Sequence, residues 1–266
     1  MQNSDSNPPA PALVGPPVKL KLTNVSKTYS DGTQAVAALE PVNFEVREGE
    51  FVVFFGPSGC GKSTLLNIIA GFEDVTGGEI TLDGTPVDGP HHDRLMMFQE
   101  HGLFPWLNVI QNVMYGLKRQ FRFKARARRA HALQFLQMVH LGEFEKARIH
   151  ELSGGMKQRV ALARALAPDP KILLVDEPFG ALDAMTRGKL YGDLQEIHQR
   201  TKKTIILVTH DAREAACLGD RVLVFSGRPG RIKADISISL PRPRDINAPV
   251  VAECAESIMA QLETTE

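Results

Sequence analysis

The chain has 266 residues, of which 43% are hydrophobic and 23% are charged, which is ordinary for a globular protein. Its 31 lysine and arginine residues balance its 31 aspartate and glutamate residues, so no global field attracts nucleic acid, and we expect no nucleic-acid partner. No apolar run approaches the roughly 20 residues that span a bilayer. The three cysteines, Cys60, Cys217 and Cys254, have no metal-binding spacing.

The first 17 residues, MQNSDSNPPAPALVGPP, are polar and rich in proline. They lack the charged segment and apolar core of a secretory signal, which favours a cytosolic chain. We expect residues 1–17 to form a disordered tail.

Strand and helix patterns alternate along most of the remaining chain. Alternating polar and apolar residues over 18–29 predict an edge strand. Continuous apolar runs predict buried strands over 50–56, 94–99, 171–177, 204–210 and 221–227. Helical periodicity predicts helices over 62–72, 184–201 and 211–218. This alternation favours an α/β fold with a mostly parallel central sheet.

Helical patterns without strands interrupt that rhythm between residues 108 and 167. We interpret them as an inserted helical subdomain of about residues 100–167. Three prolines, together with Asp245 and Asn247, mark residues 238–249 as a linker, and a short helix is predicted over 250–262. The expected organisation is the tail, one domain over 18–245, and a C-terminal helical extension over 246–266.

A nucleotide-binding loop is predicted at GPSGCGKST, residues 56–64. The segment matches the P-loop pattern G-x-x-x-x-G-K-[ST] and lies between a predicted strand and a predicted helix. Its glycines let backbone N–H groups turn inward around the β-phosphate. Lys62 is placed for the β- and γ-phosphates, and the Ser63 hydroxyl for Mg²⁺. The predicted contacts are Gly56, Pro57, Ser58, Gly59, Cys60, Gly61, Lys62, Ser63 and Thr64.

A second predicted strand, ILLVDE over 172–177, ends in two carboxylates. The apolar residues before Asp176 place this carboxylate at the carboxyl end of the strand, where open α/β sheets bind ligands. Asp176 can therefore support Mg²⁺, through water. Glu177 is then the candidate to polarise an attacking water molecule.

The segment ELSGGMKQRVALARAL, residues 151–166, predicts a tight turn that opens an amphipathic helix. The exposed N–H groups at such a helix start form an anion site. Because the P-loop is already a phosphate site, the residues alone leave open what a second one would hold.

With these motifs in this order, residues 18–227 resemble the ATP-binding cassette (ABC) ATPases, and LSGGMKQR (152–159) is close to that family's signature. The resemblance implies a P-loop ATPase fold with an N-terminal antiparallel β part. It also implies a head-to-tail homodimer with two ATP molecules in the seam. Ser153, Gly154 and Gly155 of one subunit would then contact the γ-phosphate on the P-loop of the other.

Four more positions match the family pattern. By this resemblance Tyr29, in KTYSDG, stacks on adenine, and Gln99 senses Mg²⁺ and the attacking water. Asp183, in GALD, belongs to a loop that communicates across the dimer, and His210 holds the γ-phosphate. One departure is that ARIHELSGG lacks the Tyr-Pro pair that many relatives carry before the signature.

The signature and DEPFGALDAMTR resemble bacterial importer ATPases, and LFPWLNVIQNV and RIKADISISLPRPRD look most like the nitrate/sulfonate/taurine branch. This implies an ATP-hydrolysing subunit, peripheral to the cytoplasmic face of the inner membrane. Its partners would be integral-membrane permease subunits and, indirectly, a periplasmic or extracellular solute-binding protein. The transported solute is not indicated by the sequence.

Two other classes of function were weighed. A soluble ABC-type ATPase could act as a conformational switch in DNA repair, translation or iron–sulfur assembly, but the chain has no coiled-coil arm and no second cassette. A P-loop kinase would have no use for LSGG, and the sequence shows no pocket for a phosphate acceptor.

Two surface features leave alternatives open. The stretch KRQFRFKARARRAH, residues 118–131, carries seven basic residues and no acid. It is either a solvated helix face or a contact with anionic lipid or an acidic permease loop. Trp106 follows Pro105, which predicts a loop. It either anchors a short helix of the membrane subunit or caps the core of the helical subdomain.

Overall fold

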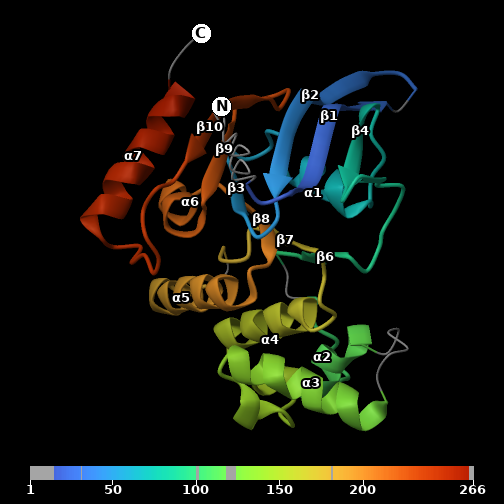
Figure 1. Cartoon of the computed structure of the whole chain (residues 1–266), viewed down its shortest axis with the longest axis vertical. Coiled ribbons are helices and arrows are strands. Elements are labelled where there is room, and N and C mark those ends of the chain that lie inside the picture. Colours follow the sequence, from blue (N-terminus) through green and yellow to red (C-terminus); the bar gives the residue numbers. More distant parts are fainter. Residues whose placement is uncertain (1–14, 31, 100–101, 118–123, 181, 264–266) are drawn as a thin grey trace, which may run out of the picture.

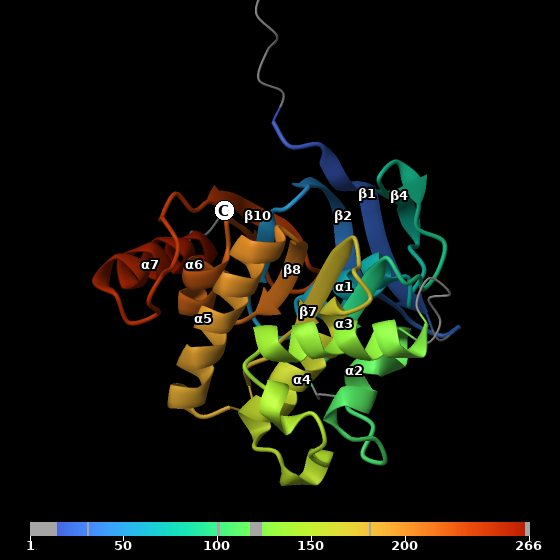
Figure 2. The same cartoon turned by 60° about the horizontal axis from the view of Figure 1, so that its bottom comes forward.

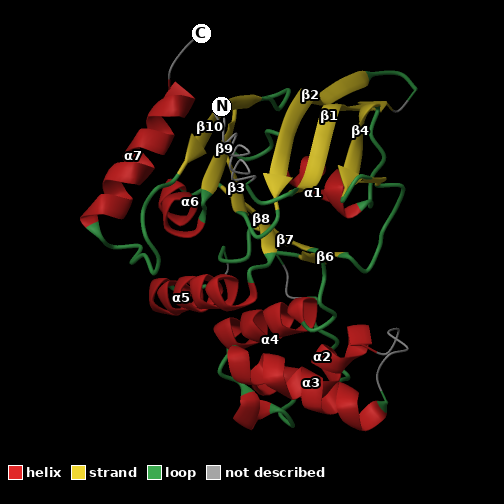
Figure 3. Ribbon diagram, viewed as in Figure 1, coloured by secondary structure: helices red, strands yellow, loops and turns green. Residues whose placement is uncertain are grey.

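The computed structural model describes residues 15–30, 32–99, 102–117, 124–180 and 182–263. Its strands form a four-stranded sheet and a six-stranded sheet, which Figure 1 and Figure 3 show beside each other with helices around them. Within the described ranges no helix is both long enough and apolar enough to cross a bilayer.

The six-stranded sheet has the order β10-β9-β3-β8-β7-β6. Its members are β3 (Phe51–Phe55), β6 (Arg94–Met97), β7 (Ile172–Asp176), β8 (Thr204–Thr209), β9 (Arg221–Phe225) and β10 (Ile232–Ser237). Only β10 runs antiparallel to its neighbour, so the prediction of a mostly parallel sheet is confirmed. The prediction that the segment 94–99 is buried was partly wrong, because β6 is an edge strand with two half-buried residues.

The smaller sheet is antiparallel, with the order β2-β1-β4-β5. It contains β1 (Val18–Ser30), β2 (Ala35–Arg47), β4 (Gly77–Leu82) and β5 (Thr85–Pro86). The prediction that the first strand is an edge strand was wrong, because β1 pairs with β2 on one side and β4 on the other. Polar and apolar residues alternate along β1 because one face of the sheet packs on the core while the other face is exposed to solvent.

Two hydrophobic layers enclose the six-stranded sheet. On one face Val52 and Phe54 of β3 pack with Leu65 and Leu66 of α1 (Lys62–Ala70) and with the smaller sheet. On the other face the alternate residues of β3 pack against helices that follow later in the chain. These include α5 (Ala184–Thr201), α6 (Ala212–Leu218) and α7 (Pro249–Glu263). The P-loop helix is therefore held between the two sheets.

Three helices group at one end of the molecule in both Figure 1 and Figure 2. They are α2 (Val109–Leu117), α3 (Ala125–Met138) and α4 (Gly154–Leu166), joined by the short turns η1 (Gly142–Phe144) and η2 (Ile149–Glu151). These helices occupy the region where a helical subdomain is predicted, and α7 occupies the place of the predicted C-terminal helix. The domain boundaries themselves stay a prediction.

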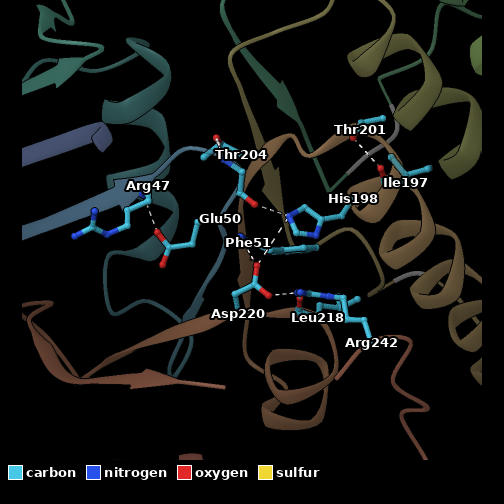
Figure 4. Close-up of polar contacts among 12 residues, drawn as sticks. Arg47, Glu50, Phe51, Ile197, His198, Thr201, Thr204, Leu218, Asp220 and Arg242 are labelled. Carbon is cyan, nitrogen blue, oxygen red and sulfur yellow. Dashed lines mark hydrogen bonds and ion pairs between the residues drawn. The ribbon is translucent and has the colours of Figure 1, made fainter. Parts of the chain in front are cut away.

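A polar cluster fixes the amino ends of the central strands (Figure 4). The backbone N–H of Phe51 donates to Asp220 Oδ2 at 3.0 Å, and that of Gly49 donates to Thr204 Oγ1 at 3.0 Å. The imidazole of His198 lies 2.9 Å from the carbonyl oxygen of Gly49. These bonds hold β3, β8 and β9 in register at the edge where they begin, while the carboxyl ends gather at the opposite edge.

Candidate functional site

The loop between β3 and α1 has the backbone shape of a phosphate cradle. Gly59 and Gly61 have φ angles of 77° and 94°, which glycine adopts without strain. A Cβ atom on Gly61 would also lie 2.8 Å from the carbonyl oxygen of Ala38. No side chain caps the start of α1, so its first N–H groups are available to an anion.

The Lys62 side chain lies inside this loop and is only 3% exposed. Its ammonium donates to the carbonyl oxygens of Gly56 and Pro57 at 2.7 and 2.8 Å. The Cys60 thiol is also buried, with its sulfur 3.7 Å from the Lys62 nitrogen. The loop therefore carries a buried positive charge beneath its backbone.

The carboxylates predicted on β7 lie beside the P-loop and next to the end of β8. The Ser63 hydroxyl donates to Asp176 Oδ1 at 3.0 Å. Burial raises the pKa of Asp176, and the charge of Glu177 raises it further. Glu177 Oε2 lies 3.1 Å from His210 Nδ1. Glu177 has a φ of 38°, a strained conformation for a residue with a side chain, and such strain is common at functional sites.

A cavity of about 320 Å³ lies at this place; Ser63 and Glu177 line it, whereas Asp176 and His210 do not. Its lining includes the predicted residues Ser58, Gly59, Gly61, Lys62, Ser63, Thr64 and Glu177. Four residues that the sequence did not indicate also line it: Val36, Ala37, Ala38 and Arg228. The useful signal for Arg228 was its position just after a buried strand, because carboxyl ends of parallel strands meet at one edge of a sheet. Gly56, Pro57 and Cys60 belong to the loop but do not line this cavity.

Tyr29 lies at the end of β1 and is 41% exposed. Its hydroxyl donates to Glu73, and the ammonium of Lys27 lies 4.9 Å from its ring centre. Burial raises the pKa of Tyr29, the bond to Glu73 adds to the rise, and a bond with Thr64 opposes it. The contact with Thr64 places the Tyr29 hydroxyl beside the first turn of α1.

Gln99 lies exposed after β6, beside the loop that follows Glu177. A Cβ atom placed on Gly180 would be 3.7 Å from Gln99 Nε2. Gln99 does not line the small cavity, so it lies beside the site without contacting the cavity.

The residues of the signature form the start of α4. Ser153 is the N-cap, and its hydroxyl accepts from the backbone N–H of Met156 at 3.3 Å. A Cβ atom on Gly155 would lie 2.2 Å from Thr186, whose N–H donates to Asp183 Oδ1 at 3.0 Å. The signature therefore packs against the Asp183 loop. Ser153, Gly154 and Gly155 are not among the residues that line the cavity of their own chain.

A larger cavity, of about 1090 Å³, lies beside the helical group. Its lining includes Phe72, Phe98, Phe104 and Tyr115, together with Arg94 and Arg164. The Trp106 ring is 69% exposed and contacts Phe104, with ring centres 5.4 Å apart. This exposure contradicts the alternative in which Trp106 caps a core.

The basic stretch falls partly outside the described residues, since 118–123 are not described. Within the described part, the guanidinium of Arg129 makes two hydrogen bonds of 2.7 Å to the carboxylate of Glu145.

Among described residues no group of three or more His, Cys, Asp or Glu side chains is arranged to hold a metal ion.

Residues 39–180 match the family model described as "ABC transporter". The taurine import ATP-binding protein TauB of Burkholderia pseudomallei is 49% identical over 84% of this chain and 86% of its own. The aliphatic sulfonates import ATP-binding protein SsuB of Bacillus cereus is 44% identical over 92% and 96%. The nitrate import ATP-binding protein NrtD of Synechocystis is 47% identical over 84% and 83%.

Solved structures share the fold. A dimeric ATP-binding cassette in a post-hydrolysis state, bound to ADP and Pi, superposes with a TM-score of 0.73. It is 36% identical in sequence, and the match covers 84% of this chain and all of that one. The resemblance inferred from the motifs is therefore matched by overall sequence and by three-dimensional structure.

Proposed function

The chain belongs to the ABC transporter family as one of its ATP-binding ATPases, and we propose that it powers import of a small sulfonate-like or nitrate-like solute. The observation that supports ATP hydrolysis most directly is the cavity that joins the P-loop to Glu177, with His210 adjoining that carboxylate. The observation that supports import is 44–49% identity, over most of their lengths, to three importer ATP-binding proteins.

In the proposed reaction, Glu177 accepts a proton from the attacking water, and His210 holds the Glu177 carboxylate and the γ-phosphate in place. Lys62 turns its ammonium from the loop carbonyls towards the β- and γ-phosphates when nucleotide enters. Tyr29 stacks on adenine. Gln99 approaches the water and the metal from the neighbouring loop.

Two oxygen donors in the site fit Mg²⁺. Ser63 Oγ and Asp176 Oδ1 lie 3.0 Å apart, and hydroxyl and carboxylate oxygens are the donors that this ion prefers. When bound, Mg²⁺ neutralises phosphate charge that develops during hydrolysis. Ser63 and Asp176 would hold it, with Gln99 as a further oxygen donor.

A second copy of the chain completes the site in this proposal. Ser153, Gly154 and Gly155 do not line the cavity of their own chain, and they lie at the start of α4, where the helix dipole favours an anion. In a head-to-tail homodimer they would contact the γ-phosphate held by the partner. ATP then joins the subunits and its hydrolysis releases them.

The membrane partners would bind at the larger cavity. A short segment of an integral-membrane permease subunit could place apolar side chains against Phe98, Phe104 and Tyr115, with Trp106 as an anchor at the rim. The chain would then be peripheral to the cytoplasmic face of the inner membrane. A periplasmic or extracellular solute-binding protein would act on it only through the permease.

The test is uptake by membrane vesicles that contain the chain and the permease subunits that copurify with it. ATP-dependent accumulation of taurine, an alkanesulfonate or nitrate is expected, and Glu177→Gln should abolish it. A chain that copurifies with no membrane protein and hydrolyses ATP alone would favour the soluble switch and contradict the importer.

A further inference from the structure

Arg228 reaches the P-loop from a part of the chain that no nucleotide-binding motif includes. It follows β9, which pairs in parallel with β3, so that Phe55 and Val224 are partners at the carboxyl ends. Because β3 leads directly into the P-loop, the loop after β9 lies next to it. This loop is residues 226–231, and we call it the β9–β10 loop.

The β9–β10 loop is held in place by backbone contacts. The N–H of Gly230 donates to the carbonyl oxygen of Ala38 at 3.0 Å, and its carbonyl accepts from Glu40 at 2.9 Å. A Cβ atom on Gly230 would lie 1.9 Å from the carbonyl oxygen of Cys60, so only glycine fits there. The chain is therefore fixed to both β2 and the P-loop two residues after Arg228.

The guanidinium of Arg228 lies directly on the P-loop. Its Nε donates to the carbonyl oxygen of Gly59 at 2.8 Å. Its Nη2 would be 2.4 Å from a Cβ atom on Gly59, so the absence of a side chain there makes room for it. Arg228 lines the small cavity together with Lys62, Ser63 and Thr64.

Most of the donor capacity of this group remains unused. Arginine carries N–H donors on all three guanidinium nitrogens, and the bond to Gly59 uses one of them. Among the described residues no carboxylate pairs with Arg228. A planar cation with unpaired donors at the wall of a phosphate cavity is suited to two-point binding of phosphate oxygens.

We propose that Arg228 is a second cationic ligand of the nucleotide and binds the β-phosphate. Gly59 lies in the middle of the loop that is predicted to cradle this phosphate. The hydrogen bond from Arg228 Nε to Gly59 orients the guanidinium group, and its two Nη nitrogens donate to phosphate oxygens. The inference rests on the proposed nucleotide site and adds a residue to it.

The experiment measures nucleotide affinity by calorimetry for wild type, Arg228→Gln, Arg228→Lys and the control Arg231→Gln. Arg231 lies in the same loop but does not line the cavity. Loss of a charge-assisted bond in Arg228→Gln should raise the Kd for ATP and for ADP alike by about tenfold. Lysine should recover part of the loss, because it keeps the charge but cannot bond Gly59 and phosphate in one plane.

Thermal unfolding without nucleotide separates ligand binding from a structural role. If Arg228 serves mainly to bind phosphate, Arg228→Gln should change the melting temperature of the free protein only slightly, because the bond to Gly59 is exposed, and should clearly reduce the rise that ADP produces. Raising NaCl from about 50 to 500 mM should reduce the difference in nucleotide Kd between wild type and Arg228→Gln, since salt screens an exposed charge.

Three results would overturn the proposal. They are an unchanged Kd in Arg228→Gln, an equal loss in Arg231→Gln, or a lowered melting temperature that accounts for the loss. The measurement involves no permease, so failure of uptake with this affinity pattern intact would contradict the importer function alone. If uptake is intact but the expected changes in nucleotide Kd are not found, only the role of Arg228 is contradicted.

Discussion

Glu177 and His210 lie 3.1 Å apart, at the ends of the neighbouring parallel strands β7 and β8. The backbone supports this contact, because the N–H of Glu177 donates to the carbonyl oxygen of Val208 at 3.1 Å. In the proposed reaction, a carboxylate fixed in this way at the wall of the small cavity takes a proton from water without rearrangement of the strands that carry it.

Glu177→Gln should bind ATP as wild type does but lose hydrolysis, because the amide keeps the shape of the carboxylate and loses its basicity. A turnover lowered by roughly 10² to 10⁴ is expected for a lost general base. The slowed variant should accumulate as an ATP-dependent dimer on size-exclusion chromatography. Glu196→Gln is the control, since Glu196 forms an exposed pair with Arg200. Wild-type turnover in Glu177→Gln would remove Glu177 from the reaction.

Ser153→Ala should separate nucleotide binding from dimer formation. The lost N-cap bond to Met156 should cost about 1 kcal/mol of stability. ATP affinity of the monomer should not change, because Ser153 does not line its own cavity. ATPase activity of the dimer should fall by at least about tenfold, as when one donor to a developing charge is removed.

The measurements for this variant are calorimetry on the monomer and activity against protein concentration. Ser257→Ala on α7 is the control, since Ser257 is exposed on a helix remote from the motifs. A monomer that loses ATP affinity on the change at Ser153 would contradict a role in the partner's site.

Trp106→Ala should leave basal ATPase activity intact and uncouple it from uptake. In the free wild-type chain the exposed indole should emit at long wavelength and be quenched readily by acrylamide. The permease subunits should shift that emission to the blue. Phe144→Ala is a control, because Phe144 is also an exposed aromatic residue of the helical group but lies in η1, in a different segment from the ring pair of Phe104 and Trp106. Normal coupling in Trp106→Ala would contradict the anchor.

The sequence predicts the parts of this molecule in which one physical signal dominates. Strands β3 and β8 are buried at every position and carry continuous apolar runs because both sheet faces are covered, and they were placed correctly. Strand β2 was not predicted, because Pro41 and shifts of its pairing with β1 break the alternation. Arg228 was missed for a different reason: its place beside Gly59 depends on pairing between strands far apart in the sequence.

His198→Gln should make stability less sensitive to acid. Burial lowers the pKa of His198, while its ring bonds to Gly49 and lies 4.0 Å from Asp220. The unfolded chain therefore binds a proton that the folded chain resists. The contribution of this residue to stability is complete above the ordinary histidine pKa of about 6.5. It falls as the pH drops towards the folded value, by at most about 1.4 kcal/mol for each pH unit.

Glutamine can keep a hydrogen bond to the Gly49 carbonyl and cannot take up a proton, so the variant isolates this effect. Urea unfolding at pH 7.5, 6.5 and 5.5 should show wild type losing stability relative to His198→Gln as the pH falls. His150→Gln, on an exposed side chain, should follow wild type. Parallel curves for wild type and His198→Gln would mean that His198 takes up no fewer protons in the folded chain than in the unfolded one.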